Sequence, residues 1–150
     1  MIKSRCGIAC EPVLCTEQDD NGNRSETCRR LYVESFVQAV VKQDADTLRG
    51  FFTTDAVICW HDSNEQLTVD EYIRANCEYP GDWNGKIQRI EKMDGGIVLV
   101  TKIFSEESSH HVTGFAKISA GKISRLDEYY SDCNEIPEWR KEMNIGKPIT

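Results

Sequence analysis

The chain has 150 residues, a length that suits a single domain with one hydrophobic core. Its formal net charge of −7 argues against nucleic acid or an anionic membrane surface as the main partner, because binding to either requires a basic face. No apolar run reaches the roughly 18 residues of a membrane span, and the first residues lack the apolar core of a signal peptide. We therefore expect a cytoplasmic protein.

The first 24 residues differ in character from the rest of the chain. The run from Glu17 to Asn23 is polar and contains the turn-forming pair Asn21-Gly22. Such a composition is typical of a loop or linker. We therefore predict a cysteine-containing appendage over residues 1–24, followed by one domain over residues 25–150.

The chain contains seven cysteines, an odd number that cannot all pair. Without an export signal the default expectation is reduced thiols. Four of the cysteines crowd the N-terminus and could in principle hold zinc tetrahedrally: Cys6, Cys10, Cys15 and Cys28. Their spacing lacks the Cys-x2-Cys knuckle that is usual in structural zinc sites. We therefore expect no metal and no cofactor. A zinc ion held by these four thiols is the weaker alternative.

Helical signals dominate the first half of the chain. Predicted helices span Ser25 or Glu26 to Gln43, Ala45 to Phe52, and Val69 to Cys77. The first has apolar residues at spacings of three and four. Asp44 is placed to cap the second helix. Thr68 and Glu71 form the capping-box pattern that opens the third.

The second half of the chain has strand-like patterns. Predicted strands cover residues 55–61, 86–93 and 97–104, followed by a hairpin over residues 110–132. The tail from Pro137 to Thr150 is expected to be irregular and to pack through Trp139. Helices followed by a run of antiparallel strands predict an α+β fold. A curved sheet wrapped around the long first helix would leave a pocket at its open end.

The hairpin from His110 to Asp132 shapes the expected pocket. A three-residue loop at Ser119-Ala120-Gly121 would use glycine where positive φ is needed. The even-numbered residues then share one face: His110, Val112, Gly114, Ala116, Ser124, Leu126, Glu128 and Tyr130. A two-residue loop would place His111 inside instead of His110. The small residues of this face leave room for a ligand.

Glu128 is the first candidate for a catalytic group. Inside a pocket, desolvation would raise its pKa and suit it to proton transfer near neutral pH; alternatively it faces solvent or pairs with Arg125 or Lys117. A histidine, His111 or His110, is the second candidate, with a hydrogen-bonded wall residue as the alternative. The predicted pocket lining consists of Trp60, Tyr72, Val112, Gly114, Leu126 and Tyr130, and plain core packing is the alternative for Trp60.

Four segments together resemble the nuclear transport factor 2-like superfamily, in its SnoaL-like (polyketide-cyclase-like) branch. They are Lys42 to Asp62, Leu67 to Gly81, Ser119 to Ile123, and Asp127 to Arg140. The resemblance covers about residues 29–150. It implies a conical, curved antiparallel sheet around the long N-terminal helix, a cystatin-like α+β barrel with a deep pocket. It also implies a homodimer formed through the outer face of the sheet.

The resemblance does not imply one activity, because this superfamily contains isomerases, cyclases, hydrolases and pure binding domains. The two aspartates of ketosteroid isomerases would fall at or next to Trp60 and near Gly114, where this chain has no carboxylate. Steroid-type isomerase chemistry is therefore not inferred. In related cyclases a histidine and an aspartate on the last strands do acid–base work, and His110 or His111 with Glu128 could fill those places.

Three functions remain open at the level of sequence. We favour a domain that binds a small apolar molecule in the pocket of the cone. An acid–base enzyme of isomerase, cyclase or hydratase type, using Glu128 and a histidine, is the first alternative. A dimeric interaction domain with a vestigial pocket is the second. The expected partners are a small-molecule ligand and a second copy of the chain, without nucleic acid or membrane.

Overall fold

The structure, a computed structural model, describes residues 26–150. The elements are α1 (Glu26–Val41), α2 (Ala45–Gly50), β1 (Phe52–Trp60), β2 (Glu65–Leu67), α3 (Val69–Cys77), β3 (Asn84–Met93), β4 (Gly96–Phe104), β5 (Ser109–Ser119), β6 (Lys122–Asp132) and α4 (Glu138–Glu142). This is the predicted α+β order. None of the described helices has the length and apolar content needed to cross a membrane. The predicted appendage over residues 1–24 lies outside the described residues.

The junction between α1 and α2 follows the predicted cap. Asp44 accepts a hydrogen bond at 3.2 Å from the backbone N–H of Thr47, which satisfies one of the unpaired donors at the start of α2. The first helix ends at Val41, two residues earlier than predicted, and Gln43 turns the chain with a φ of 55°. The second helix ends at Gly50, because Phe52 already belongs to β1.

The third helix has the predicted bounds, and its capping box is formed. The hydroxyl of Thr68 accepts from the N–H of Glu71 at 3.3 Å. The carboxylate of Glu71 accepts from the N–H of Thr68 at 2.8 Å. Two donors at the start of α3 are thus satisfied locally, which explains why the start of this helix could be read from four residues.

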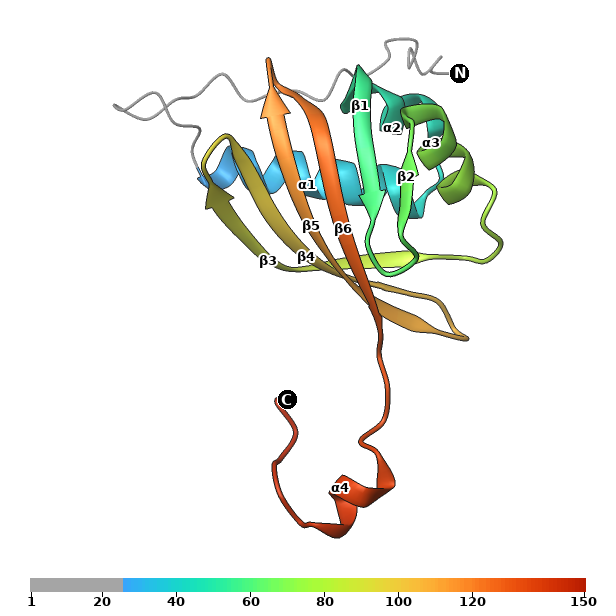
Figure 1. The fold of residues 1–150 in the computed structure, drawn as a ribbon, viewed down its shortest axis with the longest axis vertical. Coiled ribbons are helices and arrows are strands. Elements are labelled where there is room, and N and C mark those ends of the chain that lie inside the picture. Colours follow the sequence, from blue (N-terminus) through green and yellow to red (C-terminus); the bar gives the residue numbers. More distant parts are fainter. Residues whose placement is uncertain (1–25) are drawn as a thin grey trace, which may run out of the picture.

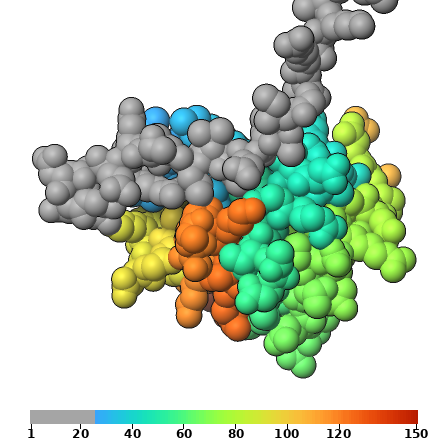
Figure 2. Space-filling view, turned by 90° about the horizontal axis from the view of Figure 1, so that it is seen from above, coloured from blue at the N-terminus to red at the C-terminus, as the bar shows by residue number. Residues whose placement is uncertain are grey.

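The described strands form one curved sheet that does not close into a complete barrel. Its strand order is β2-β1-β6-β5-β4-β3, and α1 runs across it (Figure 1). Three neighbouring pairs, β3–β4, β4–β5 and β5–β6, are antiparallel as predicted. Strands β1 and β2 are also antiparallel, whereas β1 and β6 are parallel. The short strand β2 was missed. Seen from above, the β5–β6 turn lies between the β3–β4 turn and the start of β1 (Figure 2).

The loop of the β5–β6 hairpin is shorter than predicted. Ser119 pairs with Lys122, so the loop is the two residues Ala120 and Gly121, with φ values of 47° and 80°. Two positive φ values are typical of a tight hairpin turn that matches the twist of the strands. The prediction of a three-residue loop was therefore wrong.

A bulge nevertheless restores the predicted inner face. Pairing changes from Ile118 with Ile123 to Lys117 with Arg125, which leaves Ser124 as an extra residue on β6. One extra residue reverses the alternation of side chains beyond it. The even-numbered residues of both strands therefore face inward beyond the bulge, and the buried ones are Val112, Gly114, Ala116, Leu126 and Glu128. Before the bulge, Ile123 is buried in place of Ser124.

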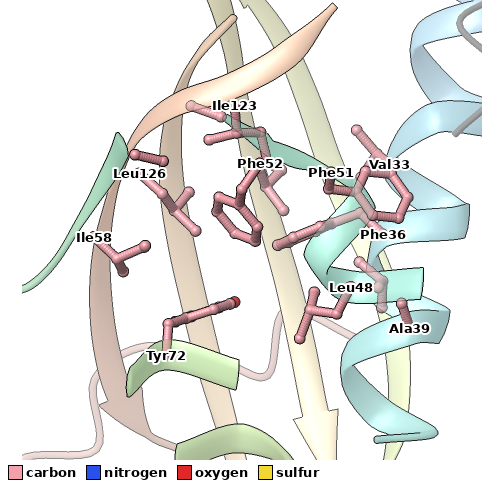
Figure 3. Packing of buried hydrophobic residues seen from close by; sticks show 14 of the residues in the cluster. Val33, Phe36, Ala39, Leu48, Phe51, Phe52, Ile58, Tyr72, Ile123 and Leu126 are labelled. Carbon is pink, nitrogen blue, oxygen red and sulfur yellow. The ribbon is translucent and has the colours of Figure 1, made fainter. Parts of the chain in front are cut away.

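The core joins α1, α2 and α3 to the sheet through packed rings and aliphatic side chains (Figure 3). Phe51 is completely buried, and its ring meets the edge of Phe36 with the ring centroids 5.4 Å apart. Phe52 and Tyr72 are packed in the same manner at 5.3 Å. Edge-to-face packing of this kind adds to the gain from burial of apolar area.

The C-terminal segment does not pack on the domain as predicted. No residue of α4 is buried, and Trp139 is 62% exposed. Figure 1 shows α4 at a distance from the sheet. The expectation that the tail packs through Trp139 was therefore wrong.

Two leucines of the helices test the assignment of the core. Leu48 in α2 is completely buried, whereas Leu31 in α1 is 54% exposed. We expect Leu48→Ala to lower the free energy of unfolding by about 2–5 kcal/mol, through lost burial and the cavity left behind. Leu31→Ala should change it by less than about 0.5 kcal/mol. Urea unfolding of both variants measures this, and equal losses would contradict the described packing.

Candidate functional site

A cavity of about 520 Å³ opens at one end of the curved sheet. The ends of α1 and α3, the β1–β2 turn and the adjacent ends of β4, β5 and β6 surround it. Its aliphatic wall consists of Val40, Val41, Ala75 and Ile103. The predicted pocket at the open end of the sheet thus corresponds to a real space between the described residues.

Gln43 holds the helical wall of the cavity in place. Its side-chain amide donates to the backbone carbonyl of Asn76 at 2.9 Å and to that of Tyr79 at 2.6 Å. These carbonyls lie at and just beyond the end of α3, where helical carbonyls lack partners within the helix. One side chain therefore ties the end of α1 to the end of α3.

Aromatic rings form the opposite wall. Trp60 from β1 and Tyr130 from β6 both line the cavity, with their ring centroids 6.0 Å apart and nearly perpendicular. Both belong to the predicted lining. Tyr72 is 1% exposed and packs behind Trp60, at 6.0 Å between ring centroids, so it supports the wall without lining it.

Glu128 lies directly behind this aromatic wall. It is only 4% exposed, and its carboxylate accepts hydrogen bonds from the indole N–H of Trp60 at 2.8 Å and from the hydroxyl of Tyr130 at 3.3 Å. On the neighbouring strands it pairs with Trp60 and Gly114, the two positions where isomerase aspartates were sought. The carboxyl group does not line the cavity itself.

The surroundings of Glu128 place its proton equilibrium near neutral pH. Burial raises its pKa from 4.5 to about 7, since the charged form loses its hydration. The two hydrogen bonds from Trp60 and Tyr130 partly oppose this, and the charge of Asp62 adds to the rise. Burial and the nearby Glu128 also raise the pKa values of Tyr72 and Tyr130 well above the ordinary value.

His110 lies at the mouth of the cavity and pairs with a different acid. Its Nδ1 is 2.8 Å from a carboxylate oxygen of Asp132, and its ring centroid is 5.9 Å from that of Trp83. Asp132 lies four positions beyond Glu128 along β6, which amounts to about 13 Å. The structure therefore does not bring His110 and Glu128 together as an acid–base pair.

His111 lies on the other face of the sheet. Its Nδ1 is 2.9 Å from the side-chain oxygen of Gln88 on β3, and it is not part of the cavity wall. The bulge at Ser124 explains this, because it leaves the even-numbered His110 inside.

Three residues of the predicted lining belong to the core instead. Val112, Gly114 and Leu126 are buried and do not line the cavity. The space above Gly114 is closed, since a Cβ atom added there would meet Leu99 at 3.4 Å and Leu126 at 3.5 Å. The space left by the missing side chain of Gly114 is therefore taken up by neighbouring core residues and not by a ligand.

The predicted cysteine cluster can be assessed at only one residue. Cys28 is 4% exposed and disulfide-bonded, which corrects the expectation of a reduced thiol there. A sulfur in a disulfide is not available as a thiolate ligand, so this state also argues against zinc at Cys28. The other three cysteines of that cluster, Cys6, Cys10 and Cys15, lie outside the described residues.

Several wall residues were missed at the level of sequence. Asp132 was not paired with His110, because the three-residue loop would have placed Tyr130 opposite this histidine. Tyr79 and Trp83 come from the connection between α3 and β3, where no periodic pattern indicates which way a side chain points. The breaker Pro80-Gly81 between them was the one local signal of a turn.

No model of a protein family matches the chain, and no curated protein matches it. Solved structures, in contrast, are similar to it in fold. A protein assigned as a ketosteroid isomerase from Kribbella flavida is 18% identical, with a TM-score of 0.65, over 77% of this chain and 87% of that one. A protein assigned as a SnoaL-like polyketide cyclase from Shewanella putrefaciens is 13% identical, with a TM-score of 0.59, over 71% and 91%.

A third similar structure is a hypothetical protein with a ketosteroid isomerase-like fold from Catenulispora acidiphila, in complex with trimethylamine. It is 11% identical, with a TM-score of 0.57, over 66% of this chain and 84% of that one. Taken together, these similarities confirm the nuclear transport factor 2-like fold. At such identities they establish the fold and no activity.

The raised pKa of Glu128 predicts a pH-dependent stability. The folded protein retains the proton that the unfolded chain releases, so the free energy of unfolding should fall as the pH rises from 4.5 through 7. Relative to Glu128→Gln, which retains an acceptor for both hydrogen bonds, the native protein should lose ~3 kcal/mol between about pH 5 and pH 8.

Urea unfolding at the two pH values measures this difference. Glu91→Gln, at an exposed position on β3, is the matched control and should keep the pH dependence of the native protein. If Glu128→Gln keeps it as well, the loss does not come from the buried carboxyl group.

Proposed function

We propose that this protein binds a small, largely apolar molecule in the cavity at the open end of the sheet. The observation that carries this proposal is the combination of a space of about 520 Å³ with aromatic and aliphatic walls. Small-molecule sites in proteins are commonly concave, mostly apolar and provided with a few oriented polar groups. Here the polar groups of the lining include Asp62, Glu65, His110, Asp132 and the hydroxyl of Tyr130.

The similar structures support a small molecule as the occupant. The Catenulispora acidiphila protein, which has the same fold, is in complex with trimethylamine. Other similar proteins are assigned as an isomerase and as a cyclase. The cytoplasmic location and the homodimer remain predictions.

Native mass spectrometry of freshly purified protein tests the proposal. We expect a co-purified organic adduct on the native chain, and a dimer would have twice the 17.1 kDa mass. Ala75→Trp should fill the cavity and lower adduct occupancy by at least about tenfold, because the indole would occupy the space of the ligand. Arg74→Trp is the matched control, since Arg74 is the adjacent exposed residue of α3 and does not line the cavity.

The two variants separate the outcomes. Loss of the adduct in Ala75→Trp alone supports binding in the cavity. An adduct retained equally by both variants would place the molecule elsewhere and contradict the proposal. A dimer without any adduct would favour the dimeric interaction domain with a vestigial pocket.

An acid–base enzyme is the second candidate, and the contact between His110 and Asp132 favours it. A carboxylate bound to one ring nitrogen orients a histidine so that the other nitrogen can transfer a proton. Glu128 does not line the cavity, so it could take part only through the hydroxyl of Tyr130. In this acid–base mechanism His110 would transfer the proton directly, in place of Glu128, for which the sequence predicted that role.

Replacement of this histidine distinguishes an enzyme from a binding protein. If the adduct is a substrate, His110→Gln should lower turnover by about 10²-fold or more while leaving its dissociation constant within about threefold. Timed mass spectrometry of the adduct and its products measures turnover, and a fluorescence titration measures binding. Unchanged turnover in His110→Gln would exclude His110 as the acid–base group.

A further inference from the structure

The cavity wall combines aromatic faces with carboxylates, and none of the described residues that line it is a lysine or arginine. We propose that the molecule bound there carries a positive charge on an alkylated nitrogen, as in a tertiary or quaternary alkylammonium ion. This inference rests on the proposed small-molecule site and specifies the chemical class of its ligand.

The aromatic side chains come from two sides of the cavity. Trp60 and Tyr130 form one pair, and Tyr79 and Trp83 form a second, with ring centroids 5.3 Å apart and planes inclined by 33°. The face of an aromatic ring carries negative electrostatic potential, and several such faces around one space are the usual way to hold an alkylammonium group. A neutral aliphatic ligand would need only apolar contact, which aliphatic side chains supply equally well.

The charged residues of the wall favour the same ligand. Asp62 and Glu65 from the β1–β2 segment and Asp132 from the end of β6 line the cavity, and all three are exposed at its mouth. Among the described residues that line the cavity, the one titratable group with a positive form is His110, which already contacts Asp132. Carboxylates around an opening of low polarity attract cations and repel anions.

Arg125 does not neutralise this wall. Its guanidinium donates to the carboxylate of Asp127 at 2.8 and 3.0 Å and contacts the sulfur of Cys59 at 3.5 Å. These odd-numbered residues lie on the outer face of the sheet, because side chains alternate along a strand. The positive charge of Arg125 is thus directed away from the cavity.

Glu128 strengthens the attraction from behind the rings. Its carboxylate accepts from the indole N–H of Trp60 and the hydroxyl of Tyr130, so negative charge lies beside the polar edges of both rings of that wall. The titratable groups that act on it are Asp62, Tyr72 and Tyr130, none of which has a positive form. A bound cation would therefore favour the ionised form of Glu128, and the ionised form would favour the cation.

Two probes that differ in charge and hardly in shape test this inference. Choline carries a trimethylammonium group, and 3,3-dimethylbutan-1-ol has a neutral carbon in place of the nitrogen. Isothermal titration of the full chain at pH 8 should show choline binding at least about tenfold more tightly than the alcohol. Ala75→Trp should abolish binding of both.

Charge-removing variants identify the groups responsible. Asp132→Asn and Glu128→Gln should each weaken choline binding by at least about threefold at low salt and leave the alcohol unaffected. Asp94→Asn is the matched control, because Asp94 lies in the β3–β4 turn and does not line the cavity. An equal effect of Asp94→Asn would indicate only the net charge of the protein and would overturn the inference.

The remaining outcomes distinguish this inference from the function on which it rests. Alcohol binding that equals or exceeds choline binding, and that Ala75→Trp removes, would overturn the cationic ligand and leave the small-molecule site intact. Binding of both probes that Ala75→Trp does not affect would contradict both. Binding of neither probe at millimolar concentration would also overturn the cationic ligand and count against the site.

Discussion

The buried carboxyl group of Glu128 is the constraint on which the site depends. A carboxyl group removed from water needs hydrogen-bond donors, and it finds them in the indole of Trp60 and the hydroxyl of Tyr130. Trp60 belongs to β1 and the other two residues to β6, so the bond from Trp60 also joins the one parallel strand pair of the described sheet. The orientation of both rings, and with it the inner wall of the cavity, follows from this contact.

The burial of Glu128 also divides the polar groups of the site into two sets. Glu128 is separated from the cavity by the two rings that donate hydrogen bonds to it, whereas His110 and Asp132 meet the solvent at the mouth. A ligand would therefore contact aromatic faces in the interior and charged groups at the entrance. This arrangement suits recognition of a molecule with one charged group more readily than proton transfer between two adjacent catalytic residues.

The similar structures carry several different assignments on one fold. The fold provides a helix across a curved sheet and an open end, and it leaves the chemistry of that end to individual side chains. In this chain the two positions sought for isomerase aspartates hold Trp60 and Gly114, and the one buried carboxyl group among residues 26–150 comes from the strand between them. The function therefore depends on these residues and not on the fold alone.

The sequence by itself determined the features that depend on local bonds. The caps at Asp44 and Thr68 use donors within three residues, so their helices began where predicted. Alternation along β5 and β6 also placed Glu128 inside.

Only the tertiary structure decided the features that depend on contacts between distant segments. The extra residue Ser124 set the register, and with it the choice of His110 over His111, because a bulge is chosen by the fit of both strands. Tyr79 and Trp83 line the cavity from an irregular connection, and Trp139 remains exposed. Such outcomes depend on which surfaces meet in space, and no pattern along the chain records that.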